Sequence, residues 1–321
     1  MISKDRFHTA MNFQKADRPA FNFWMDRRLM RLFDEQLGKD FRVTQYDADV
    51  IEAAPLLDWP SGDGIWRDGS FWHTSPPLID DWVKADGLIL PDPSAAQVYT
   101  DIEAALHAHP DKAVIVNIPG PFTLLHGMRL MDNLYTDVYD YPDEMHALIK
   151  RMMNIQTDVI KHVVKLPISG IYFQDDIASS SGLMFSKKMC GEFVFDYLKP
   201  GIEIARNAKL PVLYHSDGAV MDILEDLCQL GINAINPLQP DFNDFDTFRE
   251  RFGKRLVVYG GIDNTKIIPY GTKADIKNHI EMIFQKLGAD GGLIMSSHDI
   301  PFDCPKANID YMVELIKHCT Y

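Results

Sequence analysis

The sequence predicts an α/β protein of the (β/α)8 TIM-barrel class, with a short hairpin insertion after the second strand and residues 1–321 in a single domain. Short apolar runs rich in β-branched and aromatic residues alternate with longer stretches of helical periodicity, which is typical of βα units around a parallel sheet. There are eight such runs, and 321 residues are enough for a barrel of about 250 residues with insertions. The predicted strands cover residues 20–24, 48–54, 113–118, 170–174, 211–215, 234–236, 256–259 and 292–296.

The helices are predicted from apolar residues spaced three and four positions apart, as in the segments 141–164 and 186–207. Ser186 is expected to cap the second of these helices. Asp140 is expected to cap the first, with Pro142 tolerated in its first turn. The remaining helices are predicted at residues 26–37, 219–230, 245–252, 273–287 and 305–319.

The insertion is predicted at residues 59–93, a segment with several glycines and tryptophans. Loops of this length in compact domains are usually functional rims or lids. Trp66 and Trp72 are therefore predicted to contact a flat ligand. The alternative is that these aromatic residues form the small core that an inserted hairpin needs.

Composition restricts the classes of partner. The 46 acidic and 32 basic residues give a formal net charge of −14, which repels phosphate backbones, so we expect no nucleic-acid partner. The longest apolar runs are far too short to cross a bilayer, and residues 1–8 lack the apolar segment of a signal peptide. None of the four cysteines forms a CxxC pair, which favours a reducing, cytoplasmic setting. The sequence does not decide the oligomeric state, and a homodimer, the commonest oligomer, is kept as an alternative.

A barrel places its active site at the carboxyl ends of its strands. His215 and Asp217 follow the fifth predicted strand, and His298 follows the eighth. Residues two apart on a strand point the same way, and imidazole with carboxylate suits zinc, iron or manganese. We therefore expect these three side chains to hold a metal, with zinc foremost. The alternatives are a structural His–Asp pair, or Cys304 in place of one ligand, although a buried inert cysteine is more common.

Other polar residues follow the remaining strands. Asp175 and Asp176 form a carboxylate pair in which one pKa should rise, as a general acid requires, or they simply cap a helix. Substrate contacts are predicted for three residues at the ends of the first, third and fifth strands, namely Trp24, Asn117 and Tyr214. Asn236 and Asp263 follow the sixth and seventh strands without an assigned role.

A set of short motifs placed along these elements carries a family resemblance. They are Ala16-Asp-Arg-Pro19, Pro119-Gly-Pro-Phe122, Gln174-Asp-Asp176, Tyr214-His-Ser-Asp-Gly218, Asn236-Pro-Leu-Gln-Pro240, Tyr259-Gly-Gly-Ile-Asp263, Ser296-Ser-His-Asp-Ile300 and Pro305-Lys-Ala-Asn308. Through them the chain resembles, over nearly its whole length, the uroporphyrinogen decarboxylase superfamily. This (β/α)8 superfamily also contains cobalamin-dependent methyltransferases.

The departures from the family patterns distinguish its branches. The decarboxylases have an arginine-rich stretch after the first strand that holds the carboxylates of their substrate, and residues 22–28 show a different pattern. The thiol-methylating branch has a zinc site with His-x-Cys after the fifth strand and Cys after the eighth. This chain has His215-x-Asp217 and His298 there, so harder donors replace the thiolates. The resemblance thus favours the substrate:corrinoid methyltransferases of O-demethylase systems.

That branch implies transfer of a methyl group from a methoxylated aromatic compound to the Co(I) of a corrinoid protein. The chain lacks a DxHxxG-type corrinoid loop, so the cobalamin is expected on a partner protein. The zinc would act as a Lewis acid at the ether oxygen, with His215 among the catalytic residues. Proton donation by Asp175 or Asp176 is the alternative. A uroporphyrinogen decarboxylase-type enzyme and a thiol:methylcobalamin methyltransferase stay open as other functions.

Overall fold

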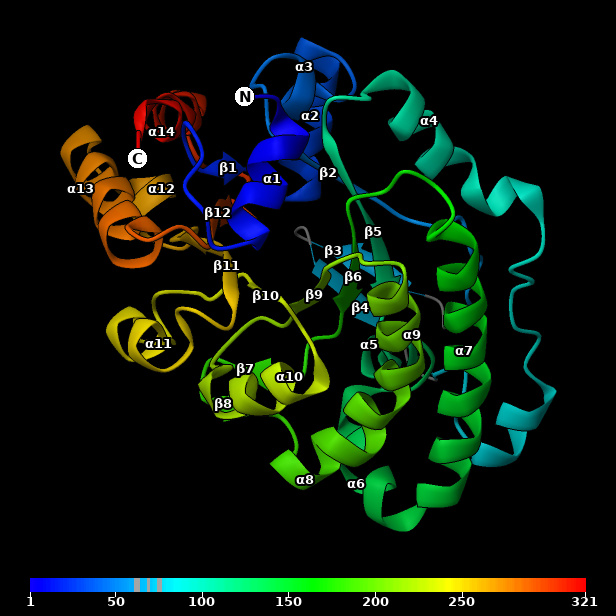
Figure 1. Cartoon of the computed structure of the whole chain (residues 1–321). Helices are drawn as coiled ribbons and strands as arrows, with labels where there is room; N and C mark the ends of the chain where they lie inside the picture. The colour runs from blue at the N-terminus through cyan, green and yellow to red at the C-terminus, as the bar shows by residue number, and fades with distance from the viewer. Residues whose placement is uncertain (61–63, 68–69, 74–76) are drawn as a thin grey trace.

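The computed structural model describes residues 1–60 and 77–321, together with the backbone of residues 64–67 and 70–73. Its centre is an eight-stranded parallel sheet that curves into a barrel, in the order β1-β12-β11-β10-β9-β6-β5-β2 (Figure 1). Each strand overlaps one of the eight predicted runs, which confirms the (β/α)8 prediction. The strands are β1 Ala20–Phe21, β2 Val50–Ala53, β5 Ala113–Pro119, β6 Gly170–Gln174, β9 Val212–His215, β10 Ala234–Asn236, β11 Val257–Ile262 and β12 Leu293–Ser297.

β1 and β2 lie at the two ends of this strand order and meet without a regular ladder. The N–H of Asp49 donates to the carbonyl of Phe21 at 2.8 Å, and the N–H of Phe21 donates to the Asp49 carboxylate at 3.0 Å. Asp49 is fully buried and also forms an ion pair with Arg18. This pairing closes the barrel at its amino-terminal end.

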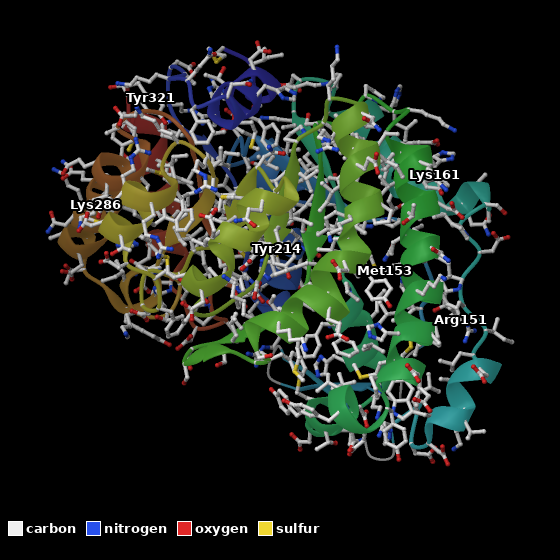
Figure 2. The ribbon with its side chains drawn as sticks, turned by 60° about the horizontal axis from the view of Figure 1, so that its bottom comes forward. Arg151, Met153, Lys161, Tyr214, Lys286 and Tyr321 are labelled. Carbon is white, nitrogen blue, oxygen red and sulfur yellow. The ribbon has the colours of Figure 1, made fainter. Side chains whose placement is uncertain are left out.

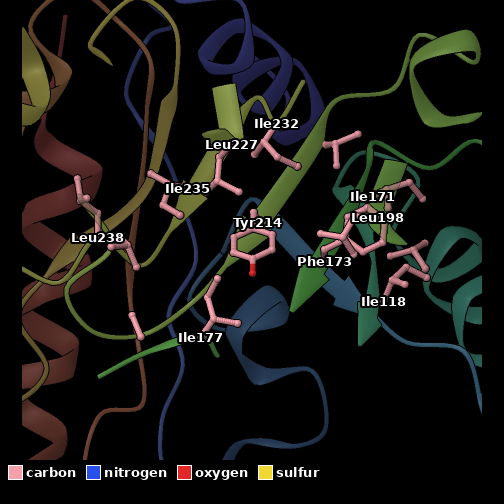
Figure 3. Packing of buried hydrophobic residues seen from close by; sticks show 14 of the residues in the cluster. Ile118, Ile171, Phe173, Ile177, Leu198, Tyr214, Leu227, Ile232, Ile235 and Leu238 are labelled. Atoms are coloured by element: carbon pink, nitrogen blue, oxygen red, sulfur yellow. The ribbon is translucent and has the colours of Figure 1, made fainter. Parts of the chain in front are cut away.

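Side chains alternate between the two faces of each strand, so the protein has one apolar core inside the barrel and another between the strands and the helices. Inward side chains pack with Phe7 and Ala10 of α1 (Ser3–Met11), which cover the amino-terminal end of the barrel. Outward side chains join the helix layer, and Figure 3 shows Tyr214 of β9 among Leu227 and Ile235. The next residue along β9 therefore faces the barrel interior.

Helices surround the barrel. The longer ones are α2 Arg27–Leu37, α4 Thr100–Ala108, α5 Pro121–Met128, α6 Met131–Asp140, α7 Pro142–Val163, α9 Asp196–Asn207, α10 Leu224–Leu230, α11 Phe245–Phe252, α13 Lys273–Ile283 and α14 Lys306–His318. On α7, Met153 is buried against the core, whereas Lys161 is exposed; Figure 2 shows this helix from a second side. The amphipathic pattern of the sequence thus corresponds to the buried and exposed faces of the helix.

The predicted caps have different outcomes. Ser186 caps α8 (Lys187–Cys190), since its Oγ accepts from the N–H of Met189 at 3.3 Å. The Asp140 cap is wrong, because α6 extends to Asp140 and the short break before α7 leaves Tyr141 at the N-cap. Pro142 does begin α7. Helices α1, α4, α5 and α6 are additional to the predicted set.

The hairpin insertion is confirmed. β3 (Gly64–Arg67) and β4 (Ser70–His73) pair antiparallel after β2. The side chains of Trp66 and Trp72 lie outside the described residues. Nowhere in residues 1–60 and 77–321 does a helix combine the length and apolarity that a membrane span requires.

Candidate metal and active site

His215 lies at the carboxyl end of β9 and is buried inside the barrel, with 7% of its surface exposed. Its Nδ1 lies 2.7 Å from Oδ1 of Asn236, the residue paired with it on β10. Its Nε2 lies 3.3 Å from Oδ1 of Asp176, which follows β6. Both ring nitrogens are therefore held by oxygen atoms from the neighbouring strands.

The structure brings His215, Asp217 and His298 together, with one possible ligand atom from each inside a span of 4.8 Å. Nε2 of His298 lies 3.5 Å from Oδ2 of Asp217. The two imidazole rings lie nearly parallel, with centroids 5.2 Å apart. Residues 81 positions apart in the chain thus meet at the barrel mouth, as the strand-end argument predicts.

The donor set fits zinc. Two imidazole nitrogens and one carboxylate form the three-ligand set of a catalytic zinc, in which a fourth position stays open for substrate. Oδ1 of Asp217 is buried, and among the described residues no hydrogen-bond partner reaches it. A buried carboxylate oxygen without a partner is costly unless a cation or donor satisfies it. Two atoms each about 2.0–2.2 Å from one ion lie at most about 4.4 Å apart, so only a small closing movement is needed.

The other residues of the His-Ser-Asp-Gly motif shape the loop. The Oγ of Ser216 accepts from the N–H groups of Ile177 and Ala178, at 3.1 and 3.2 Å, which ties the loop after β9 to the loop after β6. Gly218 has a φ of +86°, and a Cβ there would lie 2.3 Å from the carbonyl oxygen of Ser179. These contacts fix the backbone on both sides of Asp217.

The pKa values of His215, Asp176 and Asp217 are shifted in different directions by burial and by one another's charges. Burial acts to lower the pKa of His215, but the charge and hydrogen bond of Asp176, with Asp217, raise it to about 10. Burial opposes ionisation of Asp176, yet the positive charge of His215 holds the pKa of Asp176 below its usual range. Burial raises the pKa of Asp217, against the opposing charges of His298 and His215. Without metal, the cluster thus holds an imidazolium against an ionised Asp176.

Asp175 and Asp176 have separate roles. Burial, more than the charge of Asp176, raises the pKa of Asp175 to about 7, so one pKa of the pair does rise. The Asp175 carboxylate, however, accepts from the N–H groups of Phe122 and Thr123 at the start of α5. The capping alternative therefore describes Asp175. Asp176 borders the cluster, but its lowered pKa argues against a role as proton donor.

The predicted substrate residues separate by strand face. Tyr214 is fully buried on the helix side of β9, and its hydroxyl donates to the carbonyl of Asp175 at 3.2 Å. This location argues against substrate contact, because residues adjacent to His215 must face the other way. Asn117 points inward, and its Oδ1 is buried with no partner among the described residues. Trp24 is half-buried, and its Nε1 donates to Glu52 at 2.9 Å.

Cys304 does not join the cluster. Its Sγ lies 3.7 Å from the carbonyl oxygens of Ile268 and Pro305. Burial raises the pKa of its thiol to about 12, so the thiolate that a metal requires is disfavoured. The residues that converge in this arrangement are therefore His215, Asp217 and His298, without Cys304.

The barrel interior also holds a polar network that was not predicted from the sequence. Oε1 of Glu52 on β2 accepts hydrogen bonds from Asn22, Trp24 and the hydroxyl of Tyr259. An acidic residue at an inward position of an apolar strand was the available signal. Asp263, by contrast, accepts from backbone N–H groups of its own loop, and its role is structural.

Comparisons with known proteins bear on the family. A model of the uroporphyrinogen decarboxylase (URO-D) family matches residues 73–319. The uroporphyrinogen decarboxylase of Francisella philomiragia is 24% identical over 296 residues, which are 86% of this chain and 82% of the relative. The chloroplastic enzyme of Nicotiana tabacum is 20% identical over 88% of this chain and 77% of its own length.

Among solved structures, a methyltransferase from Methanosarcina mazei superposes with a TM-score of 0.71 at 15% identity, over 99% of this chain and 98% of that one. A B12-independent methionine synthase from a Shewanella species has a TM-score of 0.54 at 10% identity, over 94% and 93%. At such identities these likenesses show the fold alone. The family match covers most of the sequence, and on that basis this chain belongs to the uroporphyrinogen decarboxylase family.

Proposed function

We propose that this protein is a methyltransferase that moves a methyl group from an aryl methyl ether to the Co(I) of a separate corrinoid protein. The observation that carries the proposal is the convergence of His215, Asp217 and His298 at the barrel mouth. The fold that this chain shares with a methyltransferase from Methanosarcina mazei lends support. The site would hold zinc with one position left for the ether oxygen.

The reaction needs help at the leaving group. The Co(I) electron pair forms the new bond to the methyl carbon, the carbon–oxygen bond breaks, and the aryl oxide leaves with that bond's electron pair. When bound, zinc supplies a Lewis acid that stabilises the growing negative charge on this oxygen. An aryl oxide is a poor leaving group, so such stabilisation is the main requirement.

The chain's own residues orient the reactants. Trp24 follows β1 and is held by its hydrogen bond to Glu52 and by Arg42, whose guanidinium carbon lies 3.9 Å from the ring centroid. A fixed aromatic side chain suits a flat substrate. The methyl group must point out of the barrel, because the acceptor arrives on a second protein and transfer needs near contact.

An ether substrate accounts for the ligands better than a thiol does. Thiol activation favours a zinc site with thiolate ligands, whereas this cluster has only nitrogen and oxygen donors. Cys304, a buried thiol on the same loop as His298, makes its contacts elsewhere. We therefore favour ether cleavage over the thiol:methylcobalamin methyltransferase reaction.

A decarboxylase is the second candidate, because the similar curated relatives are named uroporphyrinogen decarboxylases. The net charge of −14 disfavours a polycarboxylate substrate. Product analysis separates the two. Purified protein is incubated with uroporphyrinogen, and in parallel with a methoxyarene panel plus reduced corrinoid protein. Demethylated phenol without release of CO2 supports the proposal, and release of CO2 from uroporphyrinogen without any phenol refutes it.

A further inference from the structure

Asn236 is the residue most closely linked to His215. It lies at the carboxyl end of β10 and is 4% exposed. Its Oδ1 lies 2.7 Å from Nδ1 of His215 and accepts from the Tyr172 hydroxyl at 2.7 Å. Its Nδ2 donates to the backbone carbonyl of Tyr259 at 2.6 Å. The side-chain amide thus has partners on three neighbouring strands of the barrel.

These partners determine which way the amide faces. A backbone carbonyl only accepts, so the NH2 group of Asn236 must point to Tyr259 and the oxygen to His215. An amide oxygen only accepts, so the facing Nδ1 of His215 must carry a hydrogen. Metal binding releases the hydrogen on Nε2, which faces Asp176 in the metal-free protein, and the lone pair for the metal is then on Nε2, the nitrogen on the far side of the ring.

We propose that Asn236 is a positioning residue that fixes the Nδ1–H tautomer of His215 and directs Nε2 to the metal. The inference rests on the proposed metal site and adds a residue to it. A histidine that binds a metal through one nitrogen commonly donates a hydrogen bond from the other, and loss of that partner costs about 10- to 100-fold in metal affinity. Tyr172 occupies the second lone pair of the same oxygen and limits movement of the amide.

Two substitutions separate this role from a structural one. Asn236→Ala removes the acceptor for His215 and the donor to Tyr259. Asn236→Asp also removes that donor but keeps an oxygen acceptor for His215. Tyr172→Phe is the control, because it removes a contact of Asn236 and leaves the contact with His215 in place. The zinc dissociation constant of each protein is measured by competition with a chromophoric chelator, next to a urea unfolding curve.

The positioning role predicts that Asn236→Ala weakens zinc binding about 10- to 100-fold. Asn236→Asp and Tyr172→Phe should stay within about threefold of the wild type, even though Asn236→Asp loses stability. Equal weakening in Asn236→Ala and Asn236→Asp overturns the proposal, because a structural role predicts that result. Wild-type zinc affinity in Asn236→Ala overturns the positioning role of Asn236 and leaves the metal site in place. A wild-type protein that binds no zinc overturns it together with the metal site.

A measurement on the wild-type protein tests the proposal even if the variants fail to fold. With 113Cd in place of zinc and 15N-labelled histidine, one-bond coupling identifies which nitrogen of His215 binds the metal. The proposal predicts coupling to Nε2 and a hydrogen on Nδ1. Coupling to Nδ1 contradicts it.

Discussion

The carboxylate of Asp175 accepts a hydrogen bond from the backbone N–H of Thr123 at 2.6 Å. This contact attaches the loop after β6 to the start of α5, where Gly120 lies so close that a Cβ would be 2.4 Å from the Asp175 carboxyl carbon. Asp176, the next residue, points to His215 instead. Two adjacent carboxylates of similar appearance in the sequence therefore have one structural and one site role.

The anchoring role of Asp175 predicts a pH-dependent stability. Its pKa is raised by burial from 3.8 to about 7, so its contribution is complete below pH 4 and is lost as the pH rises through 7. The free energy of unfolding should fall over this range by up to about 1.4 kcal/mol per pH unit relative to Asp175→Asn, which cannot ionise. Urea unfolding at pH 5, 6, 7 and 8 measures this difference. Parallel profiles for the two proteins would show that Asp175 does not titrate there.

Gly218→Ala should damage the site through the backbone. The substitution combines an unfavourable φ with a Cβ 2.3 Å from the Ser179 carbonyl oxygen. Gly38→Ala is the matched control, since Gly38 has a φ of +89° and a Cβ added there would meet nothing within 4 Å. The control should lose about 1–3 kcal/mol of stability. Gly218→Ala should lose more and also bind zinc more weakly, because Asp217 is displaced. Equal zinc affinity in both variants would argue against this role of the backbone.

Strand alternation predicts opposite outcomes for two aromatic residues. Tyr214→Phe removes a buried hydrogen bond to the Asp175 carbonyl and should cost about 1 kcal/mol of stability. It should leave the KM for a methoxyarene unchanged. Trp24→Phe removes the bond to Glu52 at the mouth and should raise that KM. Steady-state kinetics and thermal unfolding on both variants test this, and a raised KM in Tyr214→Phe alone would reverse the assignment.

The metal ligands can be separated from other potential donors. His215→Ala should abolish stoichiometric zinc in metal analysis, because it removes one of three ligands. Cys304→Ser should retain zinc, since its thiol contacts Ile268 and Pro305. His318→Ala, an exposed histidine on α14, is the matched control. Loss of zinc in Cys304→Ser would restore the thiolate alternative.

The strands and their order were predictable because each is a short apolar run, buried on both faces, as parallel sheets require. The convergence of His215 with His298 followed from this, since strand ends of a barrel share one rim. It was harder to predict from the sequence which face of its strand each side chain occupies. Tyr214 precedes His215 by one residue, and only the observed register places it on the helix side. Asn236 was noted at a strand end, but its contact with His215 depends on the pairing of β9 with β10.

Two kinds of feature were beyond the sequence. Glu52 lies in an apolar strand, and its three donors come from residues 28 to 207 positions away, so no local pattern reveals them. The Asp140 cap failed because a second helix, α6, ends at that residue. Several residues near the boundary between two helices can act as caps, and tertiary packing decides which one is used.

The most direct test of methyl transfer at this site is the absorption spectrum of the corrinoid. Wild-type protein loaded with zinc is mixed anaerobically with reduced corrinoid protein and a panel of methoxyarenes, with free cob(I)alamin as a second acceptor. Conversion of the Co(I) spectrum to that of methyl-Co(III), at a rate reduced at least a hundredfold in His215→Ala, is the predicted result. An unchanged Co(I) spectrum with every methoxyarene and both acceptors would contradict the proposed function.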